Sequence, residues 1–275
     1  IYDGRVTAHM IIPYVRVGDV VETAFSIIGS NPALGGRLSH FLTLQWGAPT
    51  VETRCRVRLP QDRKVRFRLH GAAEAPTDEI ADGVRQLGWR VLDREPWRSE
   101  SDVPAWWVGY DAIHVMDDCT WADVADLFAG SYAAPSVLPD DLTRKIDDIA
   151  ACNDTPAART AEALRFVQRS LRYHSVGMGE GGFRPRDVAS IWETRYGDCK
   201  DASRLLVTVL GRLGVEACPA LVHTSMGADL DKTPPFVGGF NHCIVKATID
   251  GKVYWLDGTR AAQAGPLDAL TPVFH

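Results

Sequence analysis

The sequence predicts an α+β protein, in which a β-rich N-terminal region precedes a core of mixed helices and strands. Three observations predict it. Residues 54–59 and 64–69 alternate apolar with basic side chains, the period of a strand that buries one face. Between residues 202 and 213, apolar side chains recur at helical spacing. Asp250-Gly251 separates two β-rich runs, as in a tight β-hairpin.

Length and composition limit the class of protein. With 275 residues, the chain is long enough for one large or two ordinary domains. Its 45% hydrophobic and 24% charged residues are typical of globular proteins. A net charge of -5 and the lack of any Lys/Arg run argue against a nucleic-acid partner. No apolar stretch approaches the roughly 18 to 20 residues of a membrane span.

We expect three parts along the chain: a β-rich domain at 1–115, a connecting segment at 116–139 and a core at 140–275. The chain starts at Ile1 without an initiator Met and reads like the middle of a β-rich domain. We therefore expect a fragment with upstream sequence missing, and the compartment cannot be read from what remains.

In the N-terminal part, five short strands are expected. Two of them, at 15–17 and 20–23, flank a Gly18-Asp19 turn, and the others lie at 41–44, 54–59 and 65–69. Their alternation favours an antiparallel, sandwich-like domain with one face of each sheet in water. We interpret the rows of Arg side chains as that solvated face rather than as a binding patch.

Three helices are expected next. A short helical pattern at 121–128 falls in the connecting segment, and a longer one at 140–152 carries an apolar stripe. A third helix begins at Pro156, with Asp154 or Thr155 as its N-cap, and carries Leu164 and Val167 on one face.

Cys199 is the candidate nucleophile. It directly follows Asp198, a good N-cap, at the start of the helix that Gly214 is expected to end. In a first helical turn, the helix dipole and the unpaired N–H groups favour thiolate over thiol. The N–H of Cys199 would also point toward an oxyanion that forms on an attacked carbonyl. A cysteine at a helix start is more often structural, so the interpretation depends on its partners.

Those partners lie on the predicted hairpin. A two-residue Asp250-Gly251 turn places His242 and Asp257 on one face, one diagonal step apart. The opposite face is apolar and suits packing against the helix behind Cys199. His242 would accept the Cys199 proton, while Asp257 would fix the imidazole tautomer and stabilise the imidazolium.

These residues resemble the transglutaminase-like superfamily, over roughly residues 140–260. The resemblance rests on Tyr196-Gly197-Asp198-Cys199-Lys200-Asp201, on Asn241-His242 and on Trp255-Leu256-Asp257-Gly258-Thr259. It implies a papain-like α+β core with Cys199 as nucleophile, His242 as base and Asp257 as third member. The run at 179–185 looks like the bacterial branch, in which a β-rich domain of unknown function precedes the core. Residues 17–22 and Asn31-Pro32 resemble that domain.

A second oxyanion donor is less clear. Trp192, Tyr196 and Asn241 are the candidates, although Trp192 follows Val188 and Ile191 on a short helix and suits the core better. Cationic side chains near the site could receive an acidic group, but we expect most of them to be solvated charges: Arg184, Arg186, Arg195 and Lys200.

The predicted function is thiol-dependent acyl transfer on amide bonds of peptide or protein substrates, through a thioester intermediate. Hydrolysis, as in a peptidase or amidase, is favoured over cross-linking because the bacterial members of the family are regarded as hydrolases. One alternative is a non-catalytic binding or scaffolding module with a transglutaminase fold. Another is an acyltransferase like the arylamine N-acetyltransferases, which usually have a helical N-terminal region.

We expect no cofactor and no metal, since the six cysteines form no CxxC pair and no EF-hand loop is visible. The cysteines are expected to be buried free thiols. The resemblance suggests a periplasmic or extracytoplasmic location, with a cytoplasmic one left open, and the oligomeric state is not determined. The Gly- and Pro-rich segment at 226–240 is either a gate beside the cleft or an ordinary surface loop.

Overall fold

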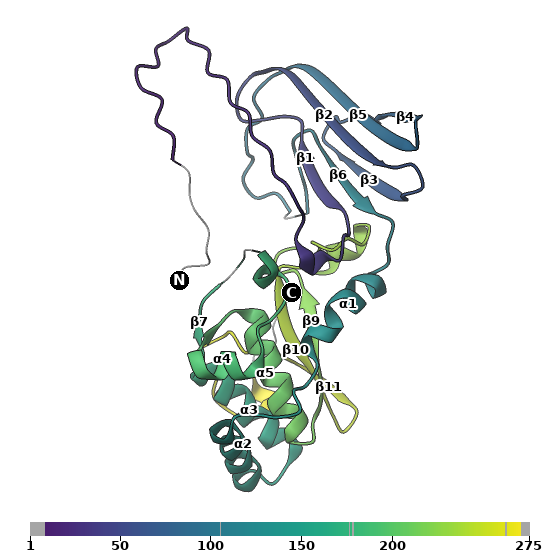
Figure 1. Cartoon of the computed structure of the whole chain (residues 1–275). Helices are drawn as coiled ribbons and strands as arrows, with labels where there is room; N and C mark the ends of the chain where they lie inside the picture. Colours follow the sequence, from purple (N-terminus) through teal and green to yellow (C-terminus); the bar gives the residue numbers. More distant parts are fainter. Residues whose placement is uncertain (1–8, 105, 176, 178, 262, 271–275) are drawn as a thin grey trace. The chain divides into compact units, whose positions relative to one another are not determined.

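The computed structural model describes residues 9–104, 106–175, 177, 179–261 and 263–270 (Figure 1). Its class is α+β, as predicted: six strands fill the N-terminal region, and helices mixed with short sheets follow. The chain divides after Ser30 into two compact units.

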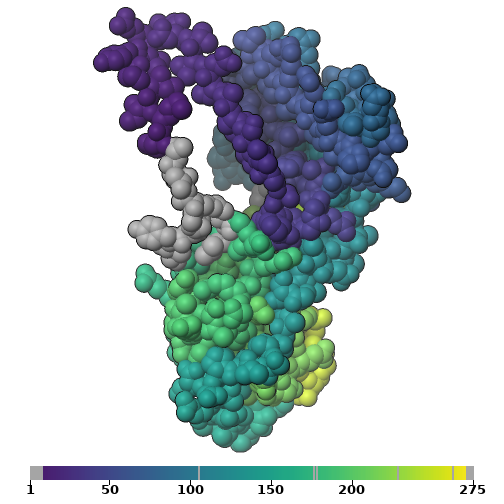
Figure 2. All heavy atoms as spheres, in the orientation of Figure 1, coloured from purple at the N-terminus to yellow at the C-terminus, as the bar shows by residue number. Residues whose placement is uncertain are grey.

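Residues 9–30 contain no strand, so the strands expected at 15–17 and 20–23 are wrong. The turn between them is present, because the N–H of Asp19 donates to the Arg16 carbonyl (3.1 Å) and the Asp19 carboxylate accepts from the Arg16 N–H (2.7 Å). The segment, purple in Figure 2, bends back on itself, and Val17 and Val20 are exposed. A β-branched run becomes a strand only when a neighbouring strand forms hydrogen bonds with its backbone N–H and C=O groups. Residues 9–30 have no such neighbouring strand among the described residues.

Two three-stranded antiparallel sheets follow. Their orders are β1-β6-β3 and β2-β5-β4. The strands are β1 (Ser39–Thr43), β2 (Thr50–Pro60), β3 (Val65–His70), β4 (Thr77–Ala81), β5 (Val84–Arg94) and β6 (Ala112–Asp117). The strands expected at 41–44, 54–59 and 65–69 correspond to β1, β2 and β3.

The two sheets share one apolar core. Leu87 and Trp89 of β5 pack with Ile113 and Val115 of β6, and Leu44 completes the buried set. On β2 the Arg side chains point into water, which fits the interpretation of the alternating pattern as a solvated face.

Five α-helices follow the sandwich. They are α1 (Trp121–Ala129), α2 (Asp140–Cys152), α3 (Pro156–Ser170), α4 (Val188–Thr194) and α5 (Cys199–Arg212). The expected bounds of α2 are confirmed, and the cap of α3 is Thr155, whose side chain accepts from the N–H of Ala158. Short 3₁₀ turns complete the list: η1 (Pro32–Leu34), η2 (Gly130–Tyr132), η3 (Gly179–Gly182), η4 (Gly227–Lys232) and η5 (Leu267–Ala269).

A third three-stranded antiparallel sheet supports α5. Its order is β11-β10-β9, formed by β9 (Glu216–Val222), β10 (His242–Ile249) and β11 (Lys252–Leu256). Helix α5 packs against β9 and β10 on one side and against α3 and α4 on the other (Figure 1). Its Leu205 and Leu206 are fully buried with Val245 and Leu256 of the hairpin. A parallel pair, β7 (Arg172–Tyr173) and β8 (Tyr196–Gly197), leads into the start of α5.

All six cysteines are free thiols, but only half of them are buried. Cys152 and Cys218 are exposed and Cys55 is half-buried, which corrects the expectation that all would be buried. Among the described residues, no helix is both long and apolar enough to cross a membrane.

Candidate active site

The start of α5 is held by Asp198. Its carboxylate accepts hydrogen bonds from the N–H groups of Lys200 (2.9 Å) and Asp201 (3.4 Å), which is the N-cap expected from the sequence. Gly197 precedes Asp198. Glycine suits this position because a Cβ here would lie 2.6 Å from the Asp201 Cβ. The Gly197-Asp198 pair therefore allows β8 to turn into α5 with Asp201 close behind.

Cys199 occupies the first position of α5. Asp198 satisfies the next two N–H groups, whereas no acceptor for the Cys199 N–H lies among the described residues. That N–H is available to an oxyanion beside the sulfur. The residue is only 7% exposed, and the part that is accessible faces a cavity.

The hairpin brings His242 and Asp257 together as the register predicted. Val245 pairs with Leu256 and Ile249 with Lys252 around the Asp250-Gly251 turn. His242 Nε2 lies 3.0 Å from Asp257 Oδ2. The other carboxylate oxygen of Asp257 accepts from the Thr259 N–H (2.8 Å) and hydroxyl (2.6 Å). Both oxygens of Asp257 are thus hydrogen-bonded, and this fixes the carboxylate that orients the imidazole.

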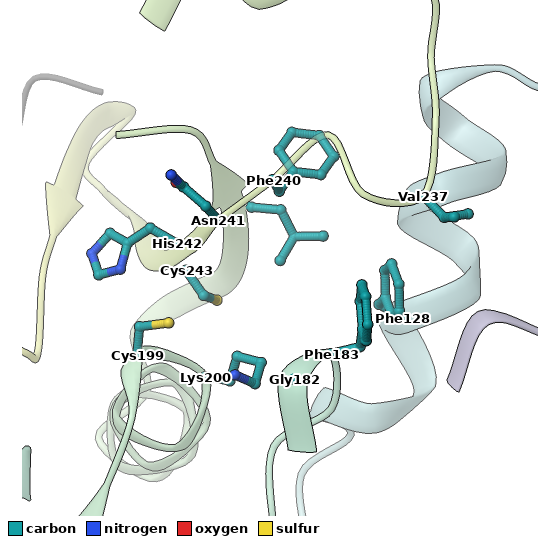
Figure 3. Close-up of a pocket in the computed structure, with 11 residues that line it drawn as sticks. Phe128, Gly182, Phe183, Cys199, Lys200, Val237, Phe240, Asn241, His242 and Cys243 are labelled. Atoms are coloured by element: carbon teal, nitrogen blue, oxygen red, sulfur yellow. The ribbon is translucent and has the colours of Figure 1, made fainter. Parts of the chain in front are cut away.

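His242 is hydrogen-bonded to Asp257 and lies near Cys199 in the lining of one cavity (Figure 3). Burial lowers the pKa of the imidazole, but the hydrogen bonds to Asp257 and Cys199 outweigh it and raise the pKa to about 9. For Asp257, burial raises the pKa, and the hydrogen bonds from His242 and Thr259 bring it below its ordinary value. The geometry therefore favours the charged imidazolium, which the Asp257 carboxylate stabilises beside the Cys199 sulfur.

A second thiol, Cys243, lies beside the first. Burial raises the pKa of Cys243 to about 11, so this thiol stays protonated at neutral pH. The Tyr132 hydroxyl donates to its sulfur (3.4 Å), and burial together with Cys243 raises the pKa of that phenol also. Tyr132 and Cys243 form a neutral wall, which leaves Cys199 as the thiol paired with the imidazole.

Cationic side chains near the site are paired with carboxylates. Lys200 Nζ lies 2.6 Å from Asp198 Oδ2, and both side chains are almost fully buried. The others named from the sequence form ion pairs farther from Cys199: Arg184 with Glu180, Arg186 with Asp201 and Arg195 with Asp141. Lys200 alone of these four lines the cavity beside Cys199.

The cavity has a volume of about 60 Å³ and joins the candidate catalytic residues to an apolar wall. Figure 3 shows Cys199 at the start of α5, near His242, with the rings of Phe128, Phe183 and Phe240 across the space. Phe128 and Phe183 are stacked, with ring centroids 6.1 Å apart. The segment at 226–240 borders the cavity through Val237 and Phe240.

Of the three candidate oxyanion donors, only Asn241 borders the cavity. Its amide is used by Thr224, which donates its N–H to Oδ1 (2.8 Å) and accepts from Nδ2 at its hydroxyl (3.0 Å). The Trp192 indole is buried in the helical core and donates to Asp141 (2.8 Å). The Tyr196 ring lies under the Arg186 guanidinium, with the ring centroid 4.6 Å from Arg186 Cζ. The structure therefore does not bring Trp192 or Tyr196 to the cavity.

Several residues that shape the site were missed by sequence reasoning. Phe128 comes from the segment interpreted as a connection, and Phe183 from a Gly-rich run. Gln168 of α3 donates to the Asp257 carbonyl (3.0 Å) and supports the loop after β11. These residues lie far from Cys199 in sequence, so no local spacing indicates them. Across the described ranges, no three His, Cys, Asp or Glu side chains gather as a metal ion requires.

The model of a family described as a domain of unknown function, DUF3857, matches residues 1–98. No curated protein matches the chain.

Among solved structures, a proposed protease from Parabacteroides distasonis matches with a TM-score of 0.66 and 17% identity, over 84% of this chain and 44% of its own. The present chain thus spans less than half the length of that protein, and the likeness shows a shared fold. A proposed cysteine protease from Cytophaga hutchinsonii matches with a TM-score of 0.37 and 12% identity, over 86% of this chain and 78% of its own. The periplasmic domain of TgpA from Pseudomonas aeruginosa matches with a TM-score of 0.32 and 13% identity, over 84% of each chain. The two lower scores do not establish a common fold.

Proposed function

We propose that this chain is a thiol-dependent acyl-transfer enzyme that acts on amide bonds of peptides or proteins, with water as the favoured acceptor. The observation that carries the proposal is His242, which is hydrogen-bonded to Asp257 and lines one cavity together with Cys199. The resemblance to the transglutaminase-like superfamily supports the same three roles. It also suggests an extracytoplasmic location and the division into parts at 1–115, 116–139 and 140–275.

The proposed reaction has two stages, acylation of Cys199 and hydrolysis of the acyl-enzyme. His242 accepts the Cys199 proton, and the thiolate attacks the amide carbonyl, so that a C–S bond forms and the oxyanion faces the Cys199 N–H. The imidazolium then protonates the departing amine as the C–N bond breaks, which leaves a thioester on Cys199. Water attacks the thioester with His242 as base, the carboxylic acid leaves, and the thiol is restored. Asp257 holds the imidazole in the tautomer that these transfers need.

Alkylation by iodoacetamide tests whether Cys199 and His242 work as a pair. The site is followed by mass spectrometry, in the intact chain and in His242→Ala, with the exposed thiols of Cys152 and Cys218 as internal references. We expect Cys199 to react at least about tenfold faster than both at pH 7, because an ordinary thiol is only a few per cent thiolate there. The excess should disappear in His242→Ala.

A small reactive ester tests whether Cys199 can be acylated, independently of whether a peptide can reach it. With p-nitrophenyl acetate, an acyl-enzyme should form on Cys199 and hydrolyse, and Cys199→Ala should abolish it. If Cys199 reacts no faster than the two exposed thiols and no acyl group appears on it, the triad is inactive and the scaffolding function holds instead.

A further inference from the structure

A larger chamber adjoins the cavity that holds Cys199. It has a volume of about 430 Å³ and lies between α1, η2 and β9. That volume falls within the range of about 300 to 1,000 Å³ that binding pockets for small ligands occupy. The 60 Å³ cavity beside Cys199 is too small for a side chain together with its amide, so a substrate needs additional space.

The two spaces share part of their walls. Phe128, Leu221 and Phe240 line both of them. In Figure 3, Phe128 and Phe240 stand on the side of the cavity opposite His242. A peptide held with its carbonyl at Cys199 therefore meets this apolar wall, which also borders the chamber.

The hollow is a consequence of small side chains. Ala125 and Ala129 lie one turn apart on α1, Ala133 directly follows η2, and Ala217 on β9 also lines the chamber. Methyl groups in these positions leave space that larger side chains would fill.

The lining carries no charged residue within the described chain. The hydroxyl of Tyr132, one of its few polar groups, is already used by Cys243. A charged or strongly polar group placed in this chamber would lose its hydration without gaining a partner. The chamber therefore selects an apolar occupant.

We propose that the chamber is the specificity subsite of the enzyme, and that it receives an aromatic or large aliphatic side chain of a peptide residue next to the amide bond at Cys199. This inference rests on the proposed function for its role in turnover, but not for the binding itself. Burying such a side chain favours binding by an amount that corresponds to roughly a tenfold or greater preference over alanine.

Occupancy of the chamber can be measured without turnover, because Cys218 lines it and is exposed. The experiment uses Cys199→Ala and measures the rate at which iodoacetamide labels Cys218. The rate is measured with acetyl-Ala-Phe-Ala-amide and with the all-alanine peptide, and Cys152 is the reference thiol. We expect the Phe peptide to slow the labelling of Cys218 at least fivefold and the alanine peptide to leave it unchanged. Equal labelling with both peptides overturns the subsite, even if Cys199 proves reactive.

A pair of variants on α1 then tests specificity. Ala125 lines the chamber, whereas Ala122 is equally exposed on the same helix and does not. We expect Ala125→Trp to reduce the preference in kcat/KM for the Phe peptide over the alanine peptide to near parity, while Ala122→Trp keeps it. Alkylation of Cys199 should be unchanged in Ala122→Trp. A preference that survives Ala125→Trp overturns the inference, whereas an inert Cys199 with Cys218 still protected overturns the proposed function alone.

Discussion

At the scale of single residues, the site depends on how His242 is flanked. Burial alone would favour the neutral imidazole, whereas the hydrogen bonds to Asp257 and Cys199 favour the charged one and prevail. Asp257 contributes because Thr259 occupies its other oxygen, so the carboxylate cannot turn away from the ring. The charge state of one imidazole is therefore set by residues 15 and 43 positions away in the chain.

Replacing Asp257 with Asn should lower the pKa of His242 from about 9, because the variant loses the negative charge that stabilises the imidazolium. The pKa of His242 is raised in the folded chain. Its contribution to the free energy of unfolding is therefore full below the unfolded pKa of roughly 6.5 and is lost as the pH rises through about 9.

Two-dimensional NMR of the imidazoles measures the pKa directly, and urea unfolding at pH 6 and at pH 9 measures the stability. The unfolding free energy of Asp257→Asn should change less between these pH values than that of the parent chain. His223, whose pKa burial lowers, serves as an internal control and should titrate identically in both. An unchanged His242 pKa would contradict the assigned role of Asp257.

At the scale of elements, the hairpin of β10 and β11 sets which side chains meet. Its two-residue turn holds Asp250 at φ 50° and Gly251 at φ 77°, as a tight turn between antiparallel strands requires. A register shift of one residue would move His242 and Asp257 onto opposite faces. The same shift would turn Val245 and Leu256 away from α5. The site and the core therefore depend on one register.

Gly251→Ala should destabilise the chain by roughly 1 to 2 kcal/mol, because an L side chain at this positive φ is strained. No atom lies within 4 Å of the added Cβ, so the cost is conformational and not a clash.

The matched control is Gly211→Ala within α5, where a Cβ also meets open space. It should stabilise the chain by about 0.5 to 1 kcal/mol, since alanine favours the helix. Urea unfolding measures both. If the two variants shift stability in the same direction, the turn does not impose the strain described.

At the scale of the whole molecule, the two largest apolar cores of the described residues share no residue. One lies between the two N-terminal sheets and includes Leu87 and Ile113. The other lies between the helices and the β9–β11 sheet and includes Leu206 and Val245. Separate cores support the proposed division into a β-rich domain and a catalytic core, because each can be lost without the other.

Leu87→Ala should cost about 2 to 5 kcal/mol within the sandwich, because it leaves a void at a fully buried position. Hydrogen–deuterium exchange should then rise in β2 and β5 but not in α5, and the alkylation rate of Cys199 should stay as in the parent chain.

Leu206→Ala, at an equally buried position of the second core, should show the reverse pattern. A loss of protection that spreads over both regions in either variant would mean that residues 31–270 unfold as one cooperative unit. It would also contradict the proposed division at 115 and 140.

Local sequence predicted those elements whose stability is decided locally. Asp198 as the cap of α5, the two-residue Asp250-Gly251 turn and the bounds of α2 all follow from contacts within a few residues. The diagonal placement of His242 and Asp257 follows from the same turn by counting. The strands expected at 15–17 and 20–23 were wrong, because a strand requires a neighbour that local sequence does not specify.

By itself, then, the sequence determined the α+β class, the N-terminal turn of α5 at Cys199 and the hairpin that pairs His242 with Asp257. Only the tertiary structure decided what surrounds them: the cavity that Cys199 and His242 both line, the neutral wall of Tyr132 and Cys243, and the apolar chamber beside Phe128. The physical reason is the range of the interactions. Caps and turns are satisfied within a few residues, whereas walls and cavities form where distant segments pack and leave space unfilled.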